Sequence, residues 1–201
     1  MSGEHYFTAQ PTGPAERRRV DVELAGRRVV VQTAGGVFSP AGVDTGTRAL
    51  LREAPAPPSH GTFLDLGCGW GPVALTLALR SPEADVFAVD VNERAIDLTR
   101  LNAASLGLQG VVASLPEDVP PALRFDLIWS NPPIRVGKQV LHDLLGTWLP
   151  RLTQEGTAYL VVQKNLGADS LHRWIRAELG LSCDRYAVSK GFRILRVSRE
   201  G

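Results

Sequence analysis

From residue 62 onward, short apolar runs alternate with longer amphipathic stretches, and this alternation limits the possible folds more than any other feature. The apolar runs predict strands over residues 62–67, 85–91, 110–114, 125–130 and 156–163. The longer stretches predict helices over residues 73–80, 93–106, 137–148 and 168–179. Because strands that alternate with helices form parallel sheets covered on both faces, we expect a doubly wound, mostly parallel, Rossmann-like α/β fold.

Both ends of the chain depart from this alternation. Residues 183–188 and 192–198 are both strand-like and only a tight turn separates them, so we predict an antiparallel strand at the C-terminal end of the sheet. Residues 19–33 alternate valine or leucine with charged residues around an Ala-Gly turn, which predicts a short N-terminal β-hairpin. We therefore divide the chain into an N-terminal extension, residues 1–35, and an α/β domain, residues 36–201.

Composition excludes several other classes of protein. The chain has 201 residues, of which 44% are hydrophobic, which suits one domain with a full core. No apolar run approaches the ~20 residues that cross a membrane, and the N-terminus lacks a secretory signal, so we expect a cytoplasmic protein. Cys68 and Cys183 are expected to be free thiols, and the four scattered histidines predict no metal site. The oligomeric state stays open.

Basic residues gather at two places although the formal net charge is only +1. The N-terminal group comprises Arg17, Arg18, Arg19, Arg27 and Arg28. The C-terminal group comprises Arg173, Arg176, Arg185, Lys190, Arg193, Arg196 and Arg199. Such residues either cover solvated faces or contact phosphates of a nucleic acid, and the sequence leaves both interpretations open.

A glycine-rich segment, "LDLGCGWGP", follows the first strand of the alternation and opens its first helix. Gly67, Gly69 and Gly71 permit positive φ angles and a close approach of the backbone to a ligand. The N-terminus of the next helix offers free N–H groups and a positive dipole end to a carboxylate or phosphate. In open α/β sheets, ligands bind at this carboxyl edge of the strands, so we expect a ligand site here.

Asp90 ends the next strand, 23 residues after Gly67. An acidic side chain at this position accepts hydrogen bonds from the two hydroxyl groups of a ribose, and a spacing of ~20 residues is typical. Together with the glycine segment, Asp90 predicts a cofactor that contains a nucleoside. The glycines follow the pattern G-x-G-x-G rather than G-x-G-x-x-G, which argues against a dinucleotide and hence against a dehydrogenase.

The segment from Asp65 to Gly71 resembles the first motif of class I S-adenosylmethionine-dependent methyltransferases, and Asp90 resembles the second motif. The resemblance implies that the glycine segment holds the methionine end of S-adenosylmethionine, that Asp90 holds the ribose, and that Asn92 lies near the adenine. The implied cofactor-binding residues are Asp65, Gly67, Cys68, Gly69, Gly71, Asp90, Val91, Asn92, Ser114 and Asn131.

Asn131, Pro132 and Pro133 follow the strand over residues 125–130, and prolines end strands. We place Asn131 beside the glycine segment, near the methyl group of a bound cofactor. The Asn131 side-chain oxygen and the Pro132 carbonyl would each accept one N–H of a planar amine, which directs the nitrogen lone pair at the methyl. The prolines fix φ and so preorganise these two catalytic acceptors.

The tetrapeptide from Asn131 to Ile134 resembles the fourth motif of amino-methyltransferases, N-P-P-aromatic. Ile134 replaces the aromatic residue, which argues against the adenine-N6 and glutamine branches. Three longer segments, "GVFSPAGVDTGTRALL", "SNPPIRVGK" and "VVQKNLGADSL", resemble the small-domain methyltransferase family, which includes bacterial ribosomal-RNA small-subunit guanine-N2 methyltransferases. By this resemblance Asp44 and Thr47 are further candidates for the cofactor site. Near Ser114 relatives carry Asp or Asn, and Glu117 or Asp118 is an alternative adenine contact here.

The resemblance implies methylation of guanine N2 in ribosomal RNA or the small ribosomal subunit. The target-binding candidates are Pro133, Ile134, Arg135, Lys138 and Lys164. Two alternatives stay open, since the acceptor could be another amine or amide nitrogen (adenine N6, a protein glutamine or a small molecule), or the chain could be a non-catalytic cofactor- or RNA-binding module. Surface cations without a role are the alternative for Arg135, Lys138 and Lys164.

Overall fold

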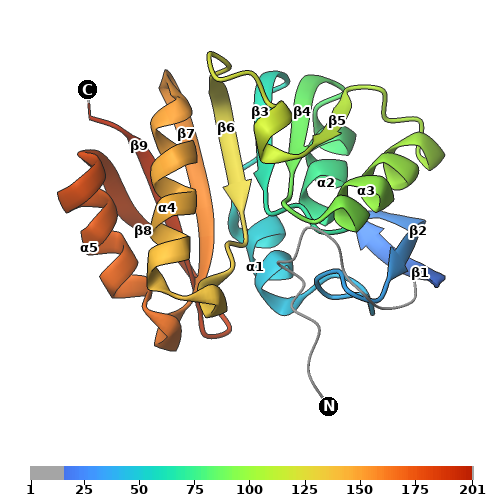
Figure 1. Ribbon diagram of the computed structural model, residues 1–201, viewed down its shortest axis with the longest axis horizontal. Coiled ribbons are helices and arrows are strands. Elements are labelled where there is room, and N and C mark those ends of the chain that lie inside the picture. Colours follow the sequence, from blue (N-terminus) through green and yellow to red (C-terminus); the bar gives the residue numbers. More distant parts are fainter. Residues whose placement is uncertain (1–15, 201) are drawn as a thin grey trace.

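The computed structural model describes residues 16–200, so what was predicted for the first fifteen residues falls outside it. A seven-stranded sheet crosses the molecule in the order β5-β4-β3-β6-β7-β9-β8 (Figure 1). Its strands are β3 (His60–Leu66), β4 (Glu83–Val89), β5 (Val111–Ser114), β6 (Phe125–Ser130), β7 (Leu152–Gln163), β8 (Leu181–Ser189) and β9 (Phe192–Arg199). In this sheet the two pairs that include β9 are antiparallel and the other pairs are parallel. The predicted fold class is confirmed.

In the described part of the chain, five α-helices cover the two faces of this sheet: α1 (Thr45–Glu53), α2 (Pro72–Arg80), α3 (Glu93–Ser105), α4 (Lys138–Trp148) and α5 (Ala168–Leu179). Successive residues of a strand point to opposite faces. Leu64 and Ile128 accordingly belong to the core cluster that holds the buried residues of α4 and α5. Phe63 and Trp129 face the other way, into the cluster that holds those of α1 and α2.

The N-terminal hairpin forms a separate two-stranded sheet from β1 (Arg17–Leu24) and β2 (Arg27–Ala34). Its turn has positive φ at both Ala25 and Gly26, as a two-residue hairpin turn requires. The hairpin lies against α2 and α3 (Figure 1), and it shares a buried cluster with Trp70 and Leu98. The predicted hairpin is confirmed, and it packs onto the domain instead of standing apart from it.

Within residues 16–200, no helix is long and apolar enough to cross a membrane. The same residues contain no cluster of three or more His, Cys, Asp or Glu side chains arranged to hold a metal ion. Cys68 and Cys183 are free, as predicted, and both are buried.

Candidate active site

The expected site residues follow three adjacent strands at the same edge of the sheet. Leu66, the last residue of β3, is in register with Val89 at the end of β4 and with Ser130 at the end of β6. The next residue of each strand is Gly67, Asp90 or Asn131. Since neighbouring strands lie about 4.8 Å apart, this register brings the three predicted positions together.

The glycine segment bends back over the end of β4 and leads into α2. The Gly67 and Cys68 N–H groups both donate to the Val89 carbonyl, at 2.8 and 3.0 Å. Gly71 has φ +94°, and a Cβ there would lie 3.0 Å from the Thr99 side chain, so glycine is required both for conformation and for space. The Cys68 side chain is buried, with its sulfur 3.6 Å from Thr99 Oγ1.

Asp90 fixes the glycine segment at the expected ribose position. Its two carboxylate oxygens accept from the backbone N–H groups of Gly69 at 2.9 Å and Asn92 at 3.0 Å. Burial raises the pKa of Asp90, and these backbone hydrogen bonds oppose the rise. Each carboxylate oxygen keeps a lone pair for a further donor such as a hydroxyl group. The adjacent Val91 is 40% exposed and provides an apolar surface beside it.

Asp65 is a fully buried carboxyl group behind the glycine segment. It accepts a hydrogen bond from the Ala74 N–H, in the first turn of α2, at 2.9 Å. Burial raises the pKa of Asp65 to about 8, the Ala74 hydrogen bond opposes the rise, and the charge of Asp90 adds to it. A cation bound in front of Asp65 would therefore stabilise its ionised form.

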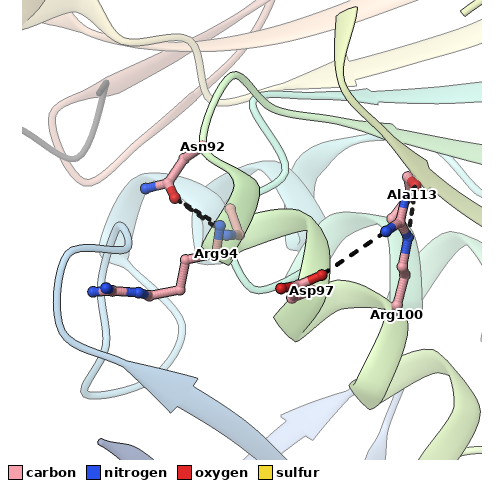
Figure 2. A network of polar contacts seen from close by, with 6 residues as sticks. Asn92, Arg94, Asp97, Arg100 and Ala113 are labelled. Atoms are coloured by element: carbon pink, nitrogen blue, oxygen red, sulfur yellow. Dashed lines mark hydrogen bonds and ion pairs between the residues drawn. The ribbon is translucent and has the colours of Figure 1, made fainter. Parts of the chain in front are cut away.

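Asn92 has a structural role that was not among its predicted roles. Its side-chain oxygen accepts from the Arg94 and Ala95 N–H groups and so caps α3 (Figure 2). Its amide nitrogen donates to the Gly36 carbonyl at 2.8 Å, which ties α3 to the segment after the hairpin. The side chain is buried by these contacts, and an adenine contact by Asn92 stays a prediction.

Ser114 ends β5 in register with Val89, on the side of the site away from Asn131. Arg100 of α3 holds this strand end because it donates to the Ala113 carbonyl at 2.8 and 3.1 Å (Figure 2). Ser114 is almost buried, whereas the alternative residues Glu117 and Asp118 are more accessible. The choice among these three for an adenine contact stays a prediction.

Asn131 lies directly after β6, and its amide nitrogen is fixed by two side chains of the α1 region. It donates to Asp44 Oδ2 at 2.7 Å and to Thr47 Oγ1 at 3.1 Å. Asp44 also caps α1, since Oδ2 accepts from the Thr47 N–H at 3.0 Å. The amide nitrogen thus donates both of its hydrogen bonds within the protein, and the side-chain oxygen is the acceptor that stays available for a ligand.

One pocket joins this amide to the glycine segment. Its lining includes Asn131, Asp44 and Thr47 on one side, Asp65 and the glycine segment on the other, and Phe38 and Ser39 at its edge. The Trp70 ring nitrogen donates to the Ser39 carbonyl at 3.1 Å and so holds that edge over the glycine segment. The structure therefore brings together the sequence-predicted positions from β3 and β6.

The Asn-Pro-Pro segment turns sharply where it leaves the sheet. Pro133 has φ −74° and ψ 79°, the geometry of an inverse γ-turn. The Ile134 N–H donates across this turn to the Pro132 carbonyl at 2.9 Å. The Pro132 carbonyl is already an acceptor within the chain, and its second lone pair stays available for the predicted contact with an amine.

The predicted target-binding cations lie on short helical turns and at a helix start. Arg135 lies in the short helix η2 (Ile134–Val136), Lys138 begins α4, and Lys164 follows β7 in η4 (Lys164–Leu166). Their contact with a substrate stays a prediction.

Phe192 is an aromatic residue near Asn131 that the sequence did not indicate. A Cβ added to Gly46 would lie 3.1 Å from the Phe192 ring and 3.3 Å from the Asn131 amide nitrogen, so both groups lie next to Gly46.

The two basic groups differ in the structure. In the C-terminal group, Arg185 and Arg193 pair with Asp169, and Arg196 pairs with Asp184. In the N-terminal group, Arg17, Arg18, Arg19, Arg27 and Arg28 are all exposed on the hairpin. Arg173, Arg176 and Lys190 of the C-terminal group are exposed as well, so both groups keep cations that a phosphate could contact.

These residues fit S-adenosylmethionine on structural grounds. The buried Asp65 carboxyl calls for a cation, and this cofactor carries an ammonium and a sulfonium group. Asp90 offers carboxylate oxygens for two hydroxyl groups, and Gly67 and Gly69 have positive φ angles, a backbone conformation that favours glycine and leaves no side chain in the pocket at these positions. Asp65, Asp90 and the glycine segment would thus hold the cofactor, with Asn131 beside its reactive end.

Comparison with known proteins places the chain in a family. The family model described as methyltransferase small domain matches residues 28–196. YbxB of Bacillus subtilis (strain 168), an uncharacterised protein, is 35% identical over 170 residues, which covers 83% of this chain and 85% of YbxB. Ribosomal RNA small subunit methyltransferase C of Pseudomonas entomophila (strain L48) is 36% identical over 190 residues, which covers 92% of this chain and 55% of the relative.

A solved structure shows the same fold. The 16S rRNA N2 G1207 methyltransferase RsmC of T. thermophilus, solved with AdoMet and guanosine, superposes with a TM-score of 0.78 at 23% identity. The match covers 93% of this chain and 52% of that protein. The chain therefore spans about half the length of the ribosomal-RNA methyltransferase C relatives and most of the length of YbxB.

The fold and the site define a class I methyltransferase. The chain belongs to the methyltransferase small domain family, as its sequence motifs indicated. The cofactor of this family is S-adenosylmethionine, which agrees with the predicted cofactor.

Proposed function

We propose that this protein transfers a methyl group from S-adenosylmethionine to the exocyclic amine of guanine, N2, in small-subunit ribosomal RNA. The observation that carries the proposal is the pocket that holds both the glycine segment and Asn131. The relatives named ribosomal RNA small subunit methyltransferase C support the choice of guanine N2 and of this RNA. In this proposal the enzyme acts in the cytoplasm, on ribosomal RNA or the small subunit.

The chain supplies acceptors and alignment in this reaction. When bound, S-adenosylmethionine provides a methyl group on a positively charged sulfur. Asn131 Oδ1 and the Pro132 carbonyl would each accept one N–H of the target amine, which turns the nitrogen lone pair toward that methyl carbon. Asp65, Asp90 and the glycine segment would hold the group that supplies the methyl, and the amine proton would leave to water. A strong base is not required, because the nitrogen becomes acidic once it carries the methyl.

In this proposal RNA would reach the pocket through the neighbouring cleft. A cleft of about 790 Å³ lies between the hairpin and α1, and Ser39 and Asp44 line both it and the pocket. The charged side chains that line the cleft are balanced, with Arg48, Arg52 and Arg80 beside Asp21, Glu23 and Asp44. A base within a duplex cannot reach the pocket, so the target must be unpaired or flipped out, at a cost of a few kcal/mol.

A second candidate function keeps the chemistry and changes the acceptor. Ile134 stands where many amino-methyltransferases carry an aromatic residue, so the surface that would stack on a base is not supplied at this position. A small-molecule amine needs no such surface, whereas a protein glutamine is disfavoured, because the glutamine branch also carries an aromatic residue at this position. The cations at residues 135, 138 and 164 favour a nucleic acid over this candidate.

Nucleoside mass spectrometry tests the proposal. The protein is incubated with labelled S-adenosylmethionine and small ribosomal subunits from a strain that lacks the enzyme, with Asn131→Ala as the control. We expect label in N2-methylguanosine with the wild-type protein and a loss of ~10²–10³-fold in the control. Label in another nucleoside, in a ribosomal protein or in none of these would contradict the proposed target.

A further inference from the structure

We infer that Asp44 and Thr47 are positioning residues that hold the Asn131 amide in one of its two orientations, with the oxygen presented to the target amine. The inference rests on the proposed amine methylation and adds residues to its machinery. A side-chain amide can rotate by half a turn and exchange its donor for its acceptor. Only one orientation can accept an N–H from a target amine, so the chain must select it.

The hydrogen-bond partners of Asn131 make this selection. A carboxylate accepts hydrogen bonds and cannot donate them, so Asp44 Oδ2 at 2.7 Å binds the nitrogen end of the amide and repels the oxygen end. Thr47 Oγ1 at 3.1 Å accepts from the same nitrogen. In the flipped orientation the Thr47 hydroxyl could still donate to the amide oxygen, so Asp44 makes the selection, because the flip loses the Asp44 hydrogen bond and places oxygen against a carboxylate.

The surroundings show that this contact is built into α1. Thr47 is 3% exposed, and Asp44 is fixed as the N-cap of α1 by the Thr47 N–H. A Cβ at Gly46 would lie 3.1 Å from Asp44 Oδ2 and 3.3 Å from Asn131 Nδ2, so glycine leaves the space that the contact needs. Residues at the start of α1 therefore contact the Asn131 amide at the end of β6 through two hydrogen bonds and leave space for it at Gly46.

The Asp44 charge also acts on the acceptor end of the amide. Hydrogen bonds polarise one another along a chain, so donation from Asn131 Nδ2 to a carboxylate increases the partial negative charge on Asn131 Oδ1. A stronger acceptor binds the target N–H more tightly as positive charge develops on the nitrogen. Asp44 thus acts through Asn131 and does not need to touch the substrate.

Matched variants separate positioning from helix capping. Asp44→Ser keeps an N-cap for α1, but its side chain is too short to reach Asn131. Asp44→Asn keeps the cap and the length, and its oxygen can still accept from Asn131. We expect Asp44→Ser to lower kcat by ~10–100-fold with KM for RNA, cofactor affinity and Tm close to wild type, and Asp44→Asn to recover most of the loss. Equal kcat for Asp44→Ser and wild type would overturn the inference.

A reciprocal exchange adds a sharper test. Asn131→Asp alone sets a second carboxylate against Asp44, and the repulsion should leave the variant inactive. The double variant, Asn131→Asp with Asp44→Asn, restores a hydrogen bond between an amide and a carboxylate with the two groups exchanged. We expect turnover of the double variant to exceed that of Asn131→Asp by at least ~10-fold, because the two positions are coupled. Equal turnover of the two variants would count against the contact.

Solvent exchange of the Asn131 side-chain amide tests the same contact without any methyl transfer. The signal is assigned in an NMR spectrum by its absence in Asn131→Ala. We expect exchange at least ~10-fold faster in Asp44→Ser than in the wild type, because the variant lacks a hydrogen bond that slows exchange. Unchanged exchange would overturn the inference even if the enzyme methylates guanine. Faster exchange together with no methylation by the wild type would instead contradict the proposed function alone.

Discussion

The two sides of the candidate active site are built differently. On the side of β3 and β4, backbone N–H groups hold both predicted carboxylates, with Gly69 bound to Asp90 and Ala74 bound to Asp65. On the side of β6 and β7, the predicted target-binding cations lie at the surface, next to short helical turns. A preorganised half is typical of a site for one small molecule, and an open, cationic half suits a large polyanion. The difference predicts that a small cofactor binds on the side of β3 and β4 and that a larger, anionic substrate binds on the side of β6 and β7.

The largest effect is expected for the residue at the junction of the two sides. Asn131→Ala should lower turnover by ~10²–10³-fold, as for the loss of one preorganised polar partner, and leave cofactor affinity nearly unchanged. Single-turnover kinetics and calorimetry measure the two quantities separately. Loss of binding in proportion to rate would place Asn131 in the cofactor half and break the comparison.

The next effect concerns the preorganised half alone. Asp90→Ala should weaken cofactor binding by about 1.5–3 kcal/mol, since the variant loses hydrogen bonds to a charged group. It also frees the Gly69 N–H, which Asp90 holds at 2.9 Å. Asp90→Asn is the matched control, because it keeps one oxygen acceptor and should lose less. Isothermal calorimetry with wild-type affinity in Asp90→Ala would remove Asp90 from the site.

A pH dependence is expected from Asp65, whose pKa burial raises to about 8. With this pKa the free protein would bind a proton at Asp65 near neutral pH, and a cationic cofactor favours the ionised form, so the ratio of wild-type to Asp65→Asn affinity should rise about tenfold from pH 7 to pH 9. The ratio removes the titration of the cofactor's own α-ammonium group, which falls in the same range. Asp90 and Cys68 are the neighbouring titratable groups, and burial raises the pKa of both. Calorimetry in two buffers measures the proton released, and Asp65→Asn should abolish that release.

The same pKa makes a prediction for the free protein. Because the folded-state pKa of Asp65 lies above its unfolded value, its contribution to the free energy of unfolding is present at low pH and is lost as pH rises through about 8. Asp65→Asn should therefore raise Tm relative to the wild type most strongly above pH 8, without cofactor. A difference in Tm that does not depend on pH would argue against a raised pKa.

The smallest single effects are expected on the open half. Replacing Arg135, Lys138 or Lys164 by Gln should weaken RNA binding only a few-fold each and should lower the salt slope by about one for each phosphate that the variant no longer neutralises. Cofactor affinity should stay at the wild-type value. Filter binding over a series of salt concentrations measures the slope. An unchanged slope in all three variants would show that RNA approaches from another surface.

Much of the fold could be predicted because its signals are local. Helix α5 and strand β6 begin and end where the apolar pattern placed them, at residues 168–179 and 125–130. Strand β7 begins at Leu152 instead of residue 156, since Leu152 pairs with Phe125 across a register shift in the two strands. The position of β9 between β7 and β8 depends on contacts between distant segments, which no local pattern encodes.

The candidate site also has residues that local sequence signals predicted and contacts that these signals could not predict. The glycine segment, Asp90 and Asn131 follow strand ends, so spacing along the chain located them. The contact between Asp44 and Asn131 joins residues 87 positions apart, and its importance became visible only when the strands were assembled. The capping role of Asn92 was also missed, although Asn before a helical stretch is a common N-cap signal.

The central claim is that the Asn131 oxygen lies beside the reactive end of the cofactor. The most direct measurement is a crystal structure with sinefungin, an unreactive analogue that carries an amine in place of the transferable methyl. The account predicts that Asn131 Oδ1 lies within ~5 Å of that amine, with its nitrogen still bound to Asp44. A separation above ~10 Å, or an amide turned into the hydrophobic core, would contradict it.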